Sequence, residues 1–250
     1  MKVQGGKKYY GEVIGILMLD VVGLYPMIPG DVGNASTYDF PVRIKVIEGL
    51  ADNPFPPVCD LAGNFTPEVE KTIQAVKEME KDGVRAIVMC CGFFSLLQKI
   101  LVKEVNIPVF TSPLMMVPLI ERMIRSDQKI GIMTASAERL TYEYLEPVGI
   151  TKSAPVFNIG LEKSSEFYAT HMGGTRTEMD IDLLRQEIVE IAEESIVQHP
   201  DMGAILLECT TLPSFATDIQ ASVQLPVFDY VGFINLLYQS LVQKKYYGFM

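Results

Sequence analysis

Two stretches of the sequence place a cysteine where an apolar run gives way to a turn. AIVMCCGFF at residues 86–94 contains Cys90 and Cys91, and AILLECTTL at residues 204–212 contains Cys209. A thiolate is a good base or nucleophile, and a helix N-terminus can lower the pKa of a thiol to about 3.5–7.5. Proton transfer or nucleophilic attack by a thiol is therefore the first chemistry to consider.

An internal repeat distinguishes the two adjacent cysteines. A shift of 118 residues carries Cys91 onto Cys209, whereas Cys90 falls on Glu208. The same shift superimposes the two Pro-Val-Phe segments of the chain, and IGIL near the N-terminus resembles IGIM at a shift of 116. Repeats of this kind indicate two related halves. Two such halves facing each other would place Cys91 and Cys209 across one cleft.

The elements that must position these thiols read as strands alternating with helices. Strands are expected at residues 12–19, 86–90, 107–110, 129–134, 204–209 and 225–230, and helices at 67–82, 94–104, 114–125, 137–145, 178–198 and 233–243. Such alternation predicts a parallel sheet with helices on both faces, and both cysteines fall at its ligand-binding edge. The segments 25–63 and 164–176 do not fit the alternation and are expected to be irregular loops.

The expected fold class is α/β, with two pseudo-symmetric halves, each a parallel sheet flanked by helices, and an active site in the cleft between them. The first half is predicted to cover residues 1–112 together with 229–250, and the second half 113–228. The last helix is expected to pack back on the first half.

Composition excludes several classes of function. The 250 residues carry a formal net charge of −10 and no basic cluster, which argues against a nucleic-acid partner. No apolar stretch is long enough to span a membrane. Four cysteines are too few for a disulfide framework, and the first ten residues lack the apolar part of a signal peptide, so a cytoplasmic location is expected. With two histidines, the chain has few options for a metal site, and none is predicted.

The net negative charge of the chain does not attract an anionic substrate, so an anion site must be local. Backbone peptide groups can form such a site. The backbone N–H groups of Gly92, Phe93, Thr210 and Thr211 would lie at helix starts, where they can bind a substrate carboxylate. Gly92 has no Cβ, which suits close approach of a ligand. With a thiolate on one face of a carbon acid and a thiol on the other, a proton can be removed and returned from the opposite side without a cofactor.

Three segments resemble the aspartate/glutamate/hydantoin racemase superfamily: VMCCGFF, LLECTTLP and IPGDVGN at residues 28–34. The resemblance implies a cofactor-independent racemase or epimerase acting on an amino acid or related carboxylate, with Cys91 and Cys209 as the two acid/base thiols. It also implies that Thr210 contacts the substrate carboxylate and that Thr134 lines the same site. A homodimer is the expected assembly.

The sequence also departs from the glutamate racemases of that superfamily. Those enzymes have Cys-Thr-His at the second cysteine, where this chain has Thr211 in place of the histidine. They have Asp-Ser after the first strand, where Asp20 is followed here by Val21. The chain is therefore not expected to be a glutamate racemase, and its substrate stays open among aspartate, glutamate, hydantoins and others.

Two other functions are compatible with these residues. A maleate-isomerase-like or arylmalonate-decarboxylase-like enzyme would use a single cysteine as nucleophile or acid. A non-catalytic small-molecule binding protein would retain the cleft alone. The two retained cysteines favour racemisation over single-cysteine chemistry and argue against a passive cleft.

The remaining polar and thiol residues have simpler interpretations. Asp20 and Asn34 fit equally well as contacts for a substrate ammonium or as loop caps. Cys90 is expected to fill the core, Cys59 to be a passive loop residue, His171 to be surface polar, and Glu208 to face away from the site, towards the other half or a subunit. Arg43 and Lys163 are candidates for a substrate side-chain carboxylate because they border the irregular segments.

Overall fold

The structure is a computed structural model that describes residues 5–20, 25–50, 58–173 and 176–250. Its strands are β1 (Ile14–Met18), β2 (Val42–Val46), β3 (Ala86–Met89), β4 (Val109–Phe110), β5 (Lys129–Thr134), β6 (Val156–Gly160), β7 (Met202–Leu207) and β8 (Val227–Phe228). Its α-helices are α1 (Pro67–Asp82), α2 (Gln98–Leu101), α3 (Val117–Ile120), α4 (Tyr142–Leu145), α5 (Ser165–Phe167), α6 (Ile181–Gln198), α7 (Ala216–Val223) and α8 (Tyr230–Leu241). Short 3₁₀ helices are η1 (Ala35–Thr37), η2 (Gly92–Leu97), η3 (Pro113–Met116), η4 (Glu146–Val148) and η6 (Leu212–Phe215), and η5 (Tyr168–Met172) is a π-helix.

The described residues form two four-stranded parallel sheets with the same strand order. The orders are β2-β1-β3-β4 and β6-β5-β7-β8. Ile14 pairs with Ala86 in the first sheet, and Ile130 pairs with Ala204 in the second, which are the positions that the sequence repeat relates. The expected α/β fold with two pseudo-symmetric halves is confirmed. The boundaries proposed at residues 112 and 229 stay predictions.

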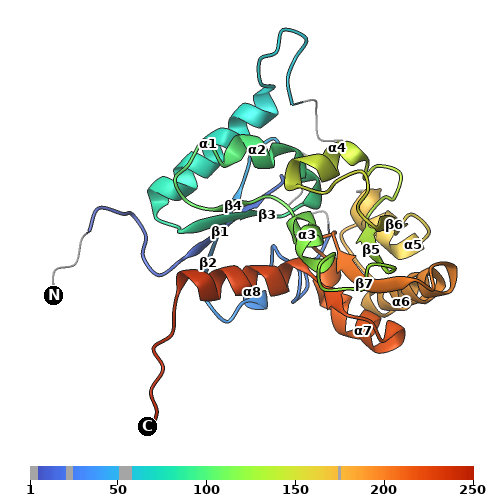
Figure 1. Cartoon of the computed structure of the whole chain (residues 1–250). Coiled ribbons are helices and arrows are strands. Elements are labelled where there is room, and N and C mark those ends of the chain that lie inside the picture. The colour runs from blue at the N-terminus through green and yellow to red at the C-terminus, as the bar shows by residue number, and fades with distance from the viewer. Residues whose placement is uncertain (1–4, 21–24, 51–57, 174–175) are drawn as a thin grey trace.

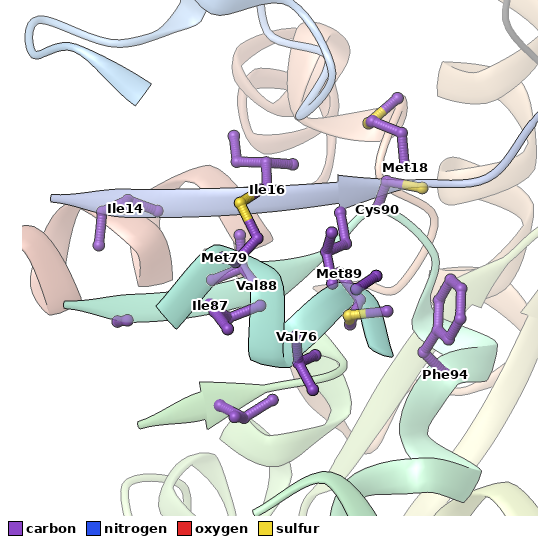
Figure 2. Close-up of a cluster of buried hydrophobic side chains, with 14 of the residues drawn as sticks. Ile14, Ile16, Met18, Val76, Met79, Ile87, Val88, Met89, Cys90 and Phe94 are labelled. Carbon is purple, nitrogen blue, oxygen red and sulfur yellow. The ribbon is translucent and has the colours of Figure 1, made fainter. Parts of the chain in front are cut away.

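The core of the first half lies on both faces of its sheet. Strands β1 and β3 are buried throughout, because helices cover both faces, and their residues are therefore uniformly apolar rather than alternating. Figure 2 shows Val76 and Met79 of α1 packed beside Ile87 and Val88 of β3. Helix α8 contributes to the same core, and Figure 1 shows α1 and α8 on opposite sides of the sheet.

The second half has a separate core on each face of its sheet. One includes apolar residues of α6 and α7, and the other includes residues of η3, α3 and α4. Phe233 of α8 packs against the latter and also against the first-half core, so this helix contacts both halves. No helix in the described ranges combines the length and the apolarity needed to cross a bilayer.

Two strands were missed by the sequence prediction. Strand β2 lies inside the segment 25–63 that was expected to be irregular, and β6 precedes the second irregular segment. Both are edge strands with mostly half-buried residues, paired on one side with β1 or β5. In β2, apolar residues alternate with Arg43 and Lys45, so it lacks the continuous apolar run by which the buried strands were recognised.

Helix boundaries follow the capping residues. Helix α1 begins at Pro67 and ends before Gly83, as predicted. Helix α6 begins three residues later than predicted, because the Asp180 side chain accepts a hydrogen bond from the Leu183 N–H and so caps the helix. The helices expected at 94–104, 114–125 and 137–145 are each reduced to one α-helical turn flanked by 3₁₀ or irregular structure.

Candidate active site

The two cysteines of the repeat occupy equivalent turns at the carboxyl edges of the two sheets. Cys91 follows β3 and precedes η2, and Cys209 follows β7 and precedes η6. The Cys91 carbonyl accepts a hydrogen bond from the Phe94 N–H at 3.1 Å, and the Cys209 carbonyl accepts one from the Leu212 N–H, also at 3.1 Å. Both cysteines are half-buried. The repeat therefore extends from the strands into the cysteine turns themselves.

The turns after β3 and β7 are in direct contact across the two halves. The Thr210 hydroxyl donates a hydrogen bond to the carbonyl of Cys90, and the Thr210 carbonyl accepts one from the Val32 N–H at 3.1 Å. On the other side, Glu208 lies so close to Gly92 that a Cβ on this glycine would be 1.7 Å from a carboxylate oxygen of Glu208. Residues adjacent to Cys91 and Cys209 thus touch at one interface.

Glu208 and Thr134 form a buried polar pair at this interface. The Thr134 hydroxyl donates a hydrogen bond of 2.7 Å to the Glu208 carboxylate, and Glu208 is only 1% exposed. Glu208 was predicted to face either the other half or a second subunit. Its carboxylate lies against Gly92 of the first half, so it faces the other half. The expectation that it faces away from the site is wrong, because the second turn lies against the first.

Aromatic rings lie next to Cys91. The ring of Phe93 packs edge-on against that of Tyr144 of α4, with centroids 4.7 Å apart. Burial raises the pKa of Tyr144, and the charge of a Cys91 thiolate is the next largest contribution. The Tyr144 hydroxyl is therefore within electrostatic range of the thiol. Tyr144 was not predicted as a site residue, because nothing in the sequence places α4 beside the turn after β3.

Asp31 is a second buried carboxylate, and it contacts the turn after Cys209. The Thr211 hydroxyl donates a hydrogen bond of 2.8 Å to one Asp31 oxygen, and the Gly33 N–H donates one of 2.7 Å to the other. Asp31 is 2% exposed, and burial raises its pKa to about 6 despite these two hydrogen bonds. Its loop fits against η6 through Gly30, which has φ +102° and where a Cβ would lie 2.5 Å from the Ser214 Cα.

Tyr25 brings a hydroxyl group to the same place. The pKa of Tyr25 is raised well above its usual value. Burial is the largest cause, and the charges of Asp31, Cys209 and Cys90 raise this pKa further. The neighbouring Thr211 hydroxyl acts in the opposite direction and lowers this pKa. Sequence reasoning missed Tyr25 and Asp31, although the IPGDVGN stretch was recognised. Gly30 and Gly33, which lie close to Asp31 in the sequence, were the available signal, since glycines allow a backbone to pack closely against a neighbouring element.

Asp20 and Asn34, which were also predicted to contact the substrate, form hydrogen bonds within loops. The exposed Asp20 accepts a hydrogen bond of 2.7 Å from the Gly49 N–H. Asn34 caps η1 through the Ser36 N–H and donates to the Met27 carbonyl at 2.8 Å. The sequence allowed two roles for both residues, binding of a substrate ammonium or capping of a loop. In the structure both residues cap loops.

Arg43 and Lys163 have contacts elsewhere. Arg43 forms an ion pair with Glu12 and lies over the Tyr9 ring, and Lys163 lies 3.8 Å from Glu194 of α6. Cys59 is exposed, and Cys90 is buried in the core (Figure 2).

His171 was expected to be a polar surface residue, but the structure shows it half-buried. Its ring stacks on Phe167 with centroids 4.5 Å apart and faces Tyr25 at 4.1 Å. Burial lowers the pKa of His171 to about 4, so the imidazole is neutral near pH 7. Within the described residues, no three or more His, Cys, Asp or Glu side chains are placed to hold a metal ion.

The structure therefore has two α/β halves of the same topology, with a cysteine at the end of the equivalent strand in each half. A sequence profile of the Asp/Glu/Hydantoin racemase family matches residues 47–233, and the chain belongs to that family. The resemblance inferred from the cysteine segments is confirmed.

The relatives are lyases by name. A dimethylsulfoniopropionate lyase of Durusdinium sp. clade D is 30% identical over 241 residues, covering 94% of this chain and 77% of that protein. Dimethylsulfoniopropionate lyase 3 of Emiliania huxleyi strain CCMP1516 is 29% identical over 244 residues, and the chain spans 61% of its length. Unliganded arylmalonate decarboxylase has the same fold, with a TM-score of 0.57 at 17% identity over 94% of each chain.

Proposed function

We propose that this protein is a cofactor-independent enzyme in which a cysteine thiolate removes the proton next to a substrate carboxylate. The observation that carries the proposal is the contact between the two cysteine turns through Gly92, Glu208 and Thr210. It supports the proposal because it joins the turns that carry the two half-buried cysteines, one from each half. Proton transfer by a positioned side chain of this kind contributes about 10²–10⁴-fold to a rate.

The favoured outcome of this proton removal is β-elimination from a β-sulfonium carboxylate such as dimethylsulfoniopropionate. The thiolate takes the Cα proton, the C–H electron pair becomes the Cα=Cβ double bond, and the Cβ–S bond breaks. Its electrons leave with the sulfur as neutral dimethyl sulfide, and acrylate remains. A sulfonium group needs no further activation to leave, because it departs as an uncharged sulfide. The similarity to the Durusdinium lyase supports this substrate class.

The side chains around the cysteines suit a substrate that carries a positive charge. Tyr144 and Phe93 lie near Cys91, and Tyr25 lies near Cys209. Aromatic faces attract cations with poorly hydrated alkyl groups, of which quaternary ammonium groups are the known example and a dialkylsulfonium is an analogue.

Racemisation of an amino acid is the second candidate. It is favoured by one observation, the equivalent placement of Cys91 and Cys209 in the two halves. One thiolate would remove the Cα proton, and the thiol on the opposite face would return another. Both candidates share the first step and differ in whether Cβ carries a leaving group.

Proton NMR in D₂O separates the candidates. The enzyme is incubated with dimethylsulfoniopropionate and, separately, with a panel of amino acids and hydantoins. We expect signals of dimethyl sulfide and acrylate from the former. Loss of Cα–H signals in the panel, without elimination, would replace the lyase proposal with racemisation. No elimination and no exchange at high enzyme concentration would overturn both.

A further inference from the structure

The buried carboxylate of Asp31 is not explained by the folding of its own loop. In the described part of the chain, no lysine, arginine or histidine forms an ion pair with it. A buried carboxylate without a cationic partner carries a large desolvation cost. Groups of this kind gather at functional sites. Asp31 belongs to the first half, whereas Thr211, to which it is bonded, follows Cys209 in the second half.

The hydrogen bonds around Asp31 have a single direction. A threonine hydroxyl has one hydrogen, and that of Thr211 is donated to Asp31. Thr211 therefore joins Asp31 to the turn that carries Cys209, and Tyr25 lies near both Asp31 and Cys209.

We propose that Asp31 is a positioning residue for Cys209, which acts through Thr211 and keeps the proton on the Cys209 thiol. The Thr211 hydrogen bond holds the carboxylate against the turn of Cys209, and the carboxylate charge opposes formation of a thiolate there. The inference rests on the proposed function only in treating Cys209 as a reacting group. It assigns to Cys209 the protonated form before substrate binds.

The ionisation of Asp31 is consistent with this role. Burial raises its pKa to about 6, so that near pH 7 most of the carboxylate is still charged. The stacked imidazole of His171 is neutral at that pH, because burial lowers its pKa to about 4, and it therefore does not cancel the charge. The titratable groups near Asp31 are Tyr25 and Tyr38, and those near Tyr25 also include Cys209, Cys90 and His171; Glu208 precedes Cys209 in the chain.

The test is the pH dependence of cysteine alkylation in the full chain. Each thiol is labelled with iodoacetamide across a pH series, and the extent at Cys209, Cys91 and Cys59 is read by peptide mass spectrometry. In the unmodified protein we expect the midpoint of Cys209 to lie above that of the exposed Cys59. In Asp31→Asn the midpoint of Cys209 should fall by about one pH unit, the lower end of what a neighbouring charge produces. The midpoint of Cys91 should not move.

A further variant and a matched control complete the experiment. Thr211→Val removes the hydrogen bond to Asp31 but keeps the charge, so it should lower the Cys209 midpoint by less than Asp31→Asn. Asp20→Asn also changes a carboxylate that accepts a backbone N–H, and it should leave Cys209 unchanged. If Asp31→Asn does not fold, Thr211→Val decides the question.

An unchanged or raised Cys209 midpoint in every folded variant would overturn the inference. A lowered midpoint in a protein that acts on none of the tested substrates would uphold it and count against the proposed function alone. Where activity is found, the pH profile of kcat should shift in Asp31→Asn in the same direction as the alkylation midpoint. A purely structural role for Asp31 would lower activity without shifting this profile.

Discussion

Cys90 and Cys91 are neighbours in the sequence with different surroundings. The Cys90 sulfur accepts a hydrogen bond from the Leu19 N–H at 3.1 Å and lies in the core of the first half. Cys91 is half-buried at the turn, in reach of Tyr144. Successive side chains of a strand point to opposite faces, and this explains the difference. The adjacency of the two cysteines therefore does not indicate a redox pair.

Substitution of each cysteine should separate their roles. Cys91→Ser and Cys209→Ser should each reduce turnover or Cα proton exchange by about 100-fold or more, because a serine hydroxyl is a much weaker acid than a thiol. Cys90→Ser should keep the chemistry and lower stability. The measurement is NMR in D₂O, with circular dichroism as the check on folding. Loss of the chemistry in Cys90→Ser alone would mean that the repeat register is wrong.

Gly92 is required by its contact with the other half. In Gly92→Ala the new Cβ would meet the Glu208 carboxylate, which is held by Thr134 and is almost completely buried. We expect a loss of about 1–3 kcal/mol in the free energy of unfolding, typical of overpacking, together with reduced activity. Urea unfolding measures the first effect. Gly248→Ala is the control, because nothing lies near its Cβ position, and equal losses in both variants would contradict the contact.

A buried carboxylate joins α5 to the start of α6. Glu166 of α5 accepts a hydrogen bond from the Asp180 N–H at 2.7 Å and pairs with Arg176 at 2.9 Å. These bonds tie the start of the segment between α5 and α6 to the start of α6. The π-helix η5 lies between them and presents His171 to Tyr25. A π-helical turn is rare and is found frequently at functional sites, which fits its position beside Tyr25.

Removal of this carboxylate should loosen the segment. Glu166→Ala leaves the Asp180 N–H and the Arg176 guanidinium without their acceptor, at a cost of about 1.5–3 kcal/mol in the free energy of unfolding, typical of hydrogen bonds to charged groups. Hydrogen exchange should become faster across the segment from α5 to the start of α6. Glu194→Ala is the control, because this exposed residue lies 3.8 Å from Lys163 and should change stability by less than about 1 kcal/mol. Unchanged exchange in Glu166→Ala would exclude the tie.

At the scale of the whole molecule, the site exists only where the two halves meet. Asp31 of the first half bonds Thr211 of the second, and Glu208 of the second lies on Gly92 of the first. Each cysteine turn therefore receives a buried carboxylate from the opposite half. Helix α8 crosses from one half to the other (Figure 1). Titration of these buried groups must consequently affect the stability of the whole fold.

Two buried groups should give opposing pH dependences of stability. Burial lowers the pKa of His171 from 6.5 to about 4, so its contribution is lost as the pH falls from 6.5 towards 4. Burial raises the pKa of Asp31 from 3.8 to about 6, so its contribution is present at low pH and is lost as the pH rises through 6. The two effects offset each other over this range in the unmodified protein.

Single substitutions should expose each effect. In Asp31→Asn the free energy of unfolding should fall more steeply on acidification between pH 6.5 and 4 than in the unmodified protein. In His171→Gln it should fall less steeply or rise. Urea unfolding at pH steps across this range measures both slopes. Equal slopes in all three proteins would show that these groups do not have the shifted pKa values given above.

Features set by nearby residues or by the repeat could be predicted from the sequence, whereas features set by distant contacts could not. Helix α1 was predicted to the residue, because proline at its start and Gly83 at its end act locally. The edge strand β2 was missed, because its pairing with β1 depends on residues far away in the sequence. Cys91 and Cys209 were found through the repeat, whereas Tyr25, Asp31 and Tyr144 were not, because no internal counterpart marks them.

The sequence by itself determined the two halves, their parallel sheets and the pair of cysteines, since these follow from local periodicity and from the repeat of the chain upon itself. Only the tertiary structure decided what surrounds each thiol. The contact of Glu208 with Gly92 and the bond between Thr211 and Asp31 join residues more than 100 positions apart. Such contacts depend on how the two halves dock, and docking is set by the shape of both surfaces rather than by any local pattern.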